Sequence, residues 1–206
     1  YKLNPIMPKS SILIIGSGGH AKSIIDLLQT NDQYEILGLI GKPENIDKEI
    51  LGYKIIGSDR DLGKIRSKVS NAVVAIGQIK DVKLRQNIFT LLKQYNYRTP
   101  CIVSKYSYIS SYSVIGEGTC IGHNVVVNAG VNVGKYCILN TKCLIEHDSI
   151  IGDFCHISTG VLVNGNVNIG SESFIGSGSI IREGITIPSG AVVSSGKRIM
   201  NWPMKK

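Results

Sequence analysis

One histidine of this sequence is flanked by two carboxylates. His147 lies between Glu146 and Asp148, in a stretch that is otherwise mostly aliphatic or small. An acid beside an imidazole can orient the ring and make it a stronger base, and imidazole titrates nearer neutral pH than other side chains. The triplet therefore suits a general base at His147 or, equally, a solvated histidine among surface charges. Either Glu146 or Asp148 could be the acid that orients the ring.

A second candidate site is a glycine-rich turn near the start of the chain. An apolar run at residues 11–15 leads into Gly16-Ser-Gly18-Gly19-His20-Ala, and residues 24–28 then have helical spacing. Strand, glycine turn and helix in this order direct backbone N–H groups toward an anion. The G-x-G-x-x-A spacing also fits dinucleotide binding, but residues 39–42 lack the acid that would hold a ribose. We expect a phosphate-bearing ligand other than NAD, or glycines that only permit tight packing.

The turn belongs to a pattern of alternating strands and helices. Strands are expected at residues 11–15, 35–40, 51–56 and 72–76, and apolar residues between 80 and 97 have helical spacing. Such alternation predicts a small parallel α/β unit, which ends near Pro100.

The remaining chain has a strict period of six. From residue 103 to residue 199 every sixth residue is aliphatic, a spacing typical of neither a helix nor a plain sheet. Glycine often follows the aliphatic residue, and a small or β-branched residue stands four places after it. These columns predict a β-helix of hexapeptide repeats. The small column includes three cysteines, which we interpret as buried spacers: Cys137, Cys143 and Cys155.

Composition narrows the possible functions. The net charge is +8, but the basic residues are scattered and no aromatics interleave with them, so a phosphorylated substrate is favoured over nucleic acid. No apolar run approaches the ~18 residues of a membrane span, and the start lacks the pattern of a signal peptide, so we expect a cytoplasmic protein. Five cysteines argue against a disulfide framework, and none has zinc-finger spacing.

In combination, these motifs resemble the sugar O- and N-acetyltransferase family of hexapeptide acyltransferases. The resemblance rests on the glycine turn joined to a β-helix with Asn140-Thr, Ile145-Glu-His-Asp, Ile151-Gly-Asp-Phe-Cys-His and Asn164-Gly-Asn-Val. The family includes enzymes that form UDP-N-acetylbacillosamine and sialic acid O-acetyltransferases. The resemblance implies a Rossmann-like sugar-nucleotide-binding domain at residues 11–100. A left-handed β-helix acetyltransferase domain would follow at residues 101–206.

The resemblance also implies roles for particular residues. His147 matches the general base and Asp148 the acid that increases its basicity. The positions that match the acetyl-CoA and acetyl-transfer site are Asn140, His156 and Gly165. Those that match the sugar-nucleotide site are Gly18, Gly19, His20 and Gly77. A homotrimer with active sites between neighbouring β-helices is expected, and Trp202 would either stack on adenine or cap the β-helix.

The sequence thus predicts an acetyl-CoA-dependent N-acetyltransferase acting on a nucleotide-linked amino sugar of the UDP-4-amino type, in surface-glycan synthesis. O-acetylation of sialic acid is the nearest alternative, with the same base and fold. A trimeric β-helix that binds or assembles without catalysis is an alternative from another class. No metal is expected.

Overall fold

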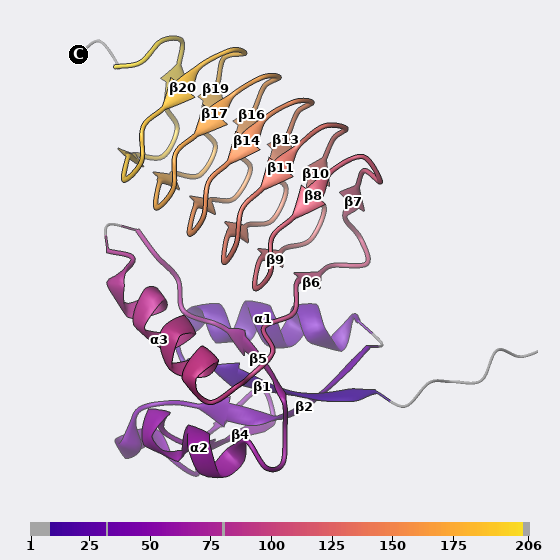
Figure 1. The fold of residues 1–206 in the computed structure, drawn as a ribbon, viewed down its shortest axis with the longest axis vertical. Helices are drawn as coiled ribbons and strands as arrows, with labels where there is room; N and C mark the ends of the chain where they lie inside the picture. The colour runs from indigo at the N-terminus through magenta and orange to yellow at the C-terminus, as the bar shows by residue number, and fades with distance from the viewer. Residues whose placement is uncertain (1–8, 32, 80, 204–206) are drawn as a thin grey trace, which may run out of the picture. The chain divides into compact units, whose positions relative to one another are not determined.

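The computed structural model describes residues 9–31, 33–79 and 81–203, and the chain forms two compact units (Figure 1). The first consists of Tyr1–Ile76 together with Phe89–Arg98. The second consists of Gly77–Ile88 together with the chain from Thr99 onward. Helix α3 (Lys83–Gln94) therefore contributes residues to both.

The first unit is built on one five-stranded sheet. Its strands are β1 (Ser10–Ile15), β2 (Tyr34–Ile40), β3 (Glu49–Ile50), β4 (Tyr53–Gly57) and β5 (Asn71–Val74), in the order β3-β4-β2-β1-β5. All neighbours are parallel except β3 and β4. The single strand expected at residues 51–56 is thus a short hairpin, because Leu51 and Gly52 adopt positive φ and turn the chain back.

Helix α1 (Gly19–Gln29) follows β1 directly. Its apolar face is fully buried, through Ala21, Ile24, Ile25, Leu27 and Leu28. Gly16, with φ of 120°, makes the turn, and a Cβ there would lie 2.8 Å from the carbonyl oxygen of Ala75. Glycine is therefore required for β1 to lead into α1 at this point. The unit also contains three short helices: η1 (Pro43–Asn45), η2 (Asp59–Asp61) and α2 (Leu62–Ile65).

The second unit is a left-handed β-helix, and Figure 1 shows its coils stacked one on the next. Each strand pairs in parallel with the strand eighteen residues later, as Val126 does with Leu144, so a coil holds three hexapeptides. This confirms the fold class predicted from the period of six. The strands are β6 (Ile102–Val103), β7 (Tyr108–Ile109), β8 (Val114–Ile115), β9 (Cys120–Ile121), β10 (Val126–Val127), β11 (Asn132–Val133), β12 (Ile138–Leu139), β13 (Leu144–Ile145), β14 (Ile150–Ile151), β15 (His156–Ile157), β16 (Leu162–Val163), β17 (Asn168–Ile169), β18 (Phe174–Ile175), β19 (Ile180–Ile181), β20 (Thr186–Ile187), β21 (Val192–Val193) and β22 (Arg198–Ile199).

The aliphatic, glycine and small-residue columns of the repeat lie at different positions in the β-helix. The aliphatic column fills the core and, from Ile121 to Ile199, is almost completely buried. The glycine column lies where coils approach closely: a Cβ on Gly152 would be 2.5 Å from the backbone nitrogen of Ser171. The small column is buried at the corners, and Cys137, Cys143 and Cys155 are buried there as predicted. Trp202 packs against the same core, as the capping alternative predicts.

A fourth column was not anticipated. From residue 118 to residue 196 every sixth residue has positive φ, and many of these positions are not glycine. Asp148, with φ of 58°, belongs to this column. The turns between strands therefore have a fixed backbone shape that places Asp148 differently from a residue in an extended segment.

Candidate active site

His147 lies in the exposed turn between β13 and β14. Its Nδ1 is 2.9 Å from Oδ2 of Asp148, and the two side chains are 64% and 68% exposed. A carboxylate only accepts hydrogen bonds, so this contact favours hydrogen on Nδ1 and a lone pair on Nε2. The contact thus has the geometry that a general base would need if a neighbouring acid held its ring.

Glu146 has different partners. Its Oε2 accepts a hydrogen bond from Nδ2 of Asn128 at 2.8 Å, and the backbone N–H of His147 points to the same atom at 3.4 Å. The ring of His147 therefore contacts Asp148, and Glu146 supports the turn through Asn128. Asn128, one coil before Glu146, is a supporting residue that sequence reasoning did not identify.

Gly165 lies one coil after His147, as its spacing predicts. A Cβ at Gly165 would be 2.6 Å from Nε2 of His147 and 2.7 Å from Cε1. The imidazole therefore lies against the glycine, and a larger residue would displace the ring. The imidazole of His147 takes up the space that a side chain at this position would need.

The other two residues expected near the acetyl-transfer site have local partners. Oδ1 of Asn140 accepts the backbone N–H of Thr141 at 2.8 Å, which shapes the turn after β12. His156 is 8% exposed, and its Nδ1 is 2.7 Å from the carbonyl oxygen of Gln78. Burial lowers the pKa of His156, the hydrogen bond to Gln78 opposes this, and the charge of Arg85 lowers it further.

Gln78 and Arg85 are also buried, and sequence reasoning missed both. The sequence does contain a hint of the role of Arg85. Its position falls on the same face of helix α3 as three apolar residues, and all four are buried: Arg85, Ile88, Phe89 and Leu92. A charged residue in such a stripe indicates an internal hydrogen-bond network.

The predicted phosphate site of the first unit is the turn between β1 and α1. Gly18 is the N-cap of α1, and a Cβ on Gly18 or Gly19 would meet nothing within 4 Å. The first turn of α1, which contains His20, holds no acidic residue, so nothing there opposes an anion. Strand β2 ends at Ile40 and is followed by Gly41, so the acid expected for NAD is absent from this position.

Gly77 follows β5 and groups with the β-helix unit. It is exposed, and a Cβ there would meet nothing within 4 Å. The four residues predicted for the sugar nucleotide thus belong to two units: three to the first and Gly77 to the second.

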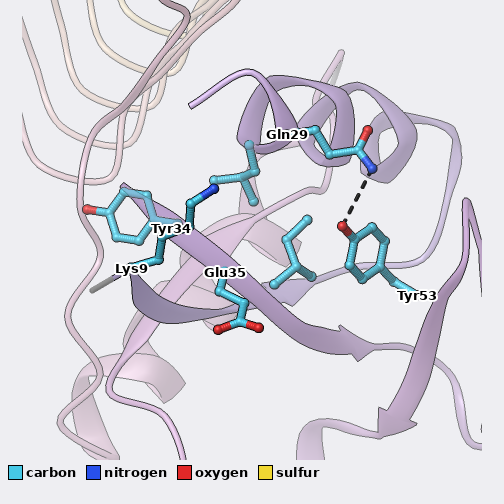
Figure 2. A pocket seen from close by; sticks show the side chains of 7 residues that line it. Lys9, Gln29, Tyr34, Glu35 and Tyr53 are labelled. Carbon is cyan, nitrogen blue, oxygen red and sulfur yellow. Dashed lines mark hydrogen bonds between the residues drawn. The ribbon is translucent and has the colours of Figure 1, made fainter. Parts of the chain in front are cut away.

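A hollow of about 350 Å³ lies elsewhere on the first unit. Figure 2 shows two of the side chains that line it pointing toward each other, with Nε2 of Gln29 3.5 Å from the Tyr53 hydroxyl. Lys9 and Tyr34 place it at the amino ends of β1 and β2, whereas ligands of such sheets bind at the carboxyl ends. None of the predicted site residues lines this hollow.

Metal-binding clusters and membrane-spanning helices are both absent from the described part of the chain. Residues 9–31, 33–79 and 81–203 contain no group of three or more His, Cys, Asp or Glu side chains that could hold a metal. No helix within those ranges is long and apolar enough to cross a bilayer.

Comparisons with known proteins match both halves of the chain. A family model described as the PglD N-terminal domain matches residues 11–92. The structure of a histidine-to-asparagine variant of perosamine N-acetyltransferase from Caulobacter crescentus, with CoA and GDP-perosamine, is 25% identical over 94% of this chain and 91% of that chain, with a TM-score of 0.85. The acetyltransferase domain of PglB from Neisseria gonorrhoeae, with acetyl coenzyme A, is 26% identical over 94% and 92%, with the same TM-score of 0.85.

A curated relative is Uncharacterized protein L142 of Acanthamoeba polyphaga mimivirus. It is 32% identical over 128 residues, which are 62% of this chain. The chain covers only 24% of the length of that protein.

The stacked hexapeptide coils define the class of protein, which is that of the acyltransferases built on a left-handed β-helix. Within this class the chain is similar to the sugar N-acetyltransferases of the two solved structures, and its first part matches the PglD N-terminal domain.

Proposed function

We propose that this protein is an acetyl-CoA-dependent N-acetyltransferase that acts on the amine of a nucleotide-linked amino sugar of the UDP-4-amino type, in surface-glycan synthesis. The observation that carries the proposal is the exposed His147, whose Nδ1 is 2.9 Å from the Asp148 carboxylate. The two similar structures support it, because one contains CoA with GDP-perosamine and the other acetyl coenzyme A.

His147 acts as the general base. Its Nε2 takes a proton from the sugar amine as the nitrogen attacks the thioester carbonyl, so a C–N bond forms and the C–S bond breaks. The proton then passes to the leaving thiolate. Asp148 holds the hydrogen of Nδ1 throughout and stabilises the imidazolium that forms, while Gly165 leaves room for the ring.

The first unit holds the nucleotide. Gly18 and Gly19 leave the N-terminus of α1 open, and phosphate oxygens accept hydrogen bonds from backbone N–H groups at such a position. His20 in the first turn contributes a polar side chain beside this site. Asn140, His156 and Gly165 belong to the acetyl-CoA and acetyl-transfer site.

The active protein is a homotrimer. The outward-facing residues of the sheet that contains β13 are apolar in five successive coils: Tyr108, Val126, Leu144, Leu162 and Ile180. Tyr108 is 60% exposed and Leu162 37% exposed, which is unusual for large apolar residues on a regular sheet. A second copy covering this column would lie beside the turn that holds His147.

The deciding experiment is acetyl transfer with a panel of acceptors. Purified protein is incubated with acetyl-CoA and, separately, UDP-linked 4-amino sugars, GDP-perosamine, free sialic acid and CMP-sialic acid, and both CoA release and acetylated product are measured. Transfer to the amino sugars supports the proposal. Transfer only to sialic acid would replace it with O-acetylation, and no transfer with any acceptor would favour a non-catalytic role.

A further inference from the structure

A buried arginine ties the segment Gly77–Ile88 to the β-helix. Arg85 is 1% exposed; its Nη1 donates to Oε1 of Gln78 at 2.9 Å and its Nη2 to the carbonyl oxygen of Tyr136 at 2.7 Å. Nε2 of Gln78 donates to the carbonyl oxygen of Phe154 at 2.7 Å. A buried guanidinium is costly unless it is hydrogen-bonded, so these contacts determine where Gln78 lies.

These contacts follow the repeat of the β-helix. Tyr136, Phe154 and Glu172 occupy one position in three successive coils. Arg85 binds the first of them and Gln78 the second, and Nε2 of Gln86 donates to Oε1 of Glu172 at 2.8 Å. The segment therefore crosses three coils. Gln78 itself makes the second contact, and Arg85, which makes the first, also binds Gln78.

Gln78 determines which nitrogen of His156 carries hydrogen. Its backbone oxygen, 2.7 Å from Nδ1, can only accept, so Nδ1 is the donor. Burial lowers the pKa of His156 and the positive charge of Arg85 acts in the same direction, although the bond to Gln78 opposes them. His156 is therefore a neutral imidazole with its hydrogen on Nδ1, and Nε2 is an acceptor.

That acceptor has no partner within the described residues. Nε2 of His156 is buried and makes no hydrogen bond there, which leaves the cost of desolvation unrecovered. The half-buried ring of Phe174 packs edge-on against the imidazole, with 5.2 Å between centroids, and is a side chain that can rotate. A donor that reached Nε2 would satisfy the acceptor; a developing oxyanion would not, because neither atom carries a hydrogen.

We propose that Arg85 and Gln78 are positioning residues of the acetyl-transfer site: they hold His156 with its hydrogen on Nδ1, so that Nε2 accepts a hydrogen bond from an amide N–H in the pantetheine arm of the co-substrate. This inference rests on the proposed function. It gives His156 a role in binding the pantetheine arm and excludes it as the donor that stabilises the oxyanion.

The first test reads the tautomer directly. The chain has four histidines, so ¹⁵N-histidine labelling gives few signals, and His156→Gln assigns those of His156 by their loss. In the wild-type protein we expect a protonated Nδ1 and an unprotonated Nε2 at neutral pH. Adding CoA should shift the Nε2 signal toward that of a hydrogen-bonded nitrogen. An Nε2–H tautomer would overturn the inference.

The second test separates positioning from general stability. Arg85→Met should raise the KM for acetyl-CoA about tenfold, the effect of one lost hydrogen bond in the bound state. It should leave kcat at saturating acetyl-CoA within about twofold, because His147 is untouched. Arg85→Lys should raise the KM for acetyl-CoA by less, since an ammonium can still donate a hydrogen bond to Gln78. Gln86→Ala, on the same helix and with its side chain bound to Glu172, is the matched control and should leave both constants and the His156 signals unchanged.

The outcomes distinguish this inference from the proposed function. Wild-type protein that binds no CoA by calorimetry would overturn both. Protein that binds CoA while the Nε2 signal of His156 does not move would overturn the inference alone. Equal effects of Arg85→Met and Gln86→Ala would also overturn it, because the segment would then act only by bracing the β-helix.

Discussion

His147 and Asp148 are neighbours in the chain, yet their side chains meet. On an extended segment adjacent side chains point to opposite faces, and by that rule neither acid beside His147 is preferred. Asp148 instead adopts φ of 58°, in the column of positive φ that recurs at every turn of the β-helix. This backbone shape lets its carboxylate reach Nδ1 of His147, and it leaves Glu146 to bind Asn128.

The two acids should therefore differ when changed one at a time. Asp148→Asn should lower kcat about tenfold or more, because an amide can donate to Nδ1 and favour the tautomer with hydrogen on Nε2. Asparagine tolerates positive φ and occurs in the same column at Asn124 and Asn166, so the fold should be unaffected. Glu146→Gln is the control and should change kcat by no more than about twofold. A larger loss in Glu146→Gln, measured by steady-state kinetics, would contradict the assignment of Asp148.

The absence of a side chain at Gly165 should also matter for activity. In Gly165→Val the new Cβ would lie only 2.6 Å from the present position of Nε2 of His147, so the ring must move. We expect a fall in kcat of about tenfold or more with an unchanged circular dichroism spectrum and unfolding midpoint. Glu183→Val, at the equivalent position one coil later, is the control. If Gly165→Val kept full activity, the imidazole would not act from its place against this glycine.

Corner residues connect one coil of the β-helix to the next. Ser149 is completely buried; its hydroxyl donates to the carbonyl oxygen of Asn164 at 3.0 Å and accepts the backbone N–H of Val167 at 3.1 Å. Thr119 and Ser173 make the same two kinds of contact in other coils. Polar residues are therefore used inside the β-helix where backbone groups at its corners need partners.

Removal of such a hydroxyl should weaken the whole element. Ser149→Ala leaves one buried and one partly buried backbone group without this partner and should lower the free energy of unfolding by about 1–3 kcal/mol in urea titrations. Ser149→Cys should lower the free energy of unfolding by less, because the thiol of Cys155 in the same column donates a hydrogen bond to the carbonyl oxygen of Gly170 at 3.2 Å. Equal stability of Ser149→Ala and the wild type would show that the corner hydroxyls do not join the coils.

The elements were more predictable from the sequence than their supporting contacts. A period of six over residues 103–199 predicts the β-helix, because each hexapeptide contributes one inward residue to a repeating core. The antiparallel strand β3 was missed because its two residues give no periodic signal. The network of Gln78, Arg85 and His156 was missed because it joins residues up to 78 positions apart, and spacing along the chain carries no information on such contacts.

The proposed trimer would form through the apolar column on the sheet that contains β13. Light scattering at micromolar concentration should give three times the monomer mass of 22.3 kDa. Leu162→Glu places a charge in the middle of that column and should dissociate the trimer while each β-helix remains folded. Thr186→Glu, on the outward face of another sheet, is the control. A wild-type monomer would contradict the trimer, and so would a trimer unaffected by Leu162→Glu.

His147 is the proposed base with which this molecule transfers an acetyl group. The most direct measurement is kcat for acetyl transfer from acetyl-CoA to a nucleotide-linked amino sugar in His147→Ala, compared with His123→Ala in the same β-helix. The core residues beside the turn, Ile145 and Ile151, are unchanged, so His147→Ala should fold normally. We predict that kcat falls by ~10²–10⁴ in His147→Ala and stays near the wild-type value in His123→Ala. A folded His147→Ala protein with full activity would rule out His147 as the general base.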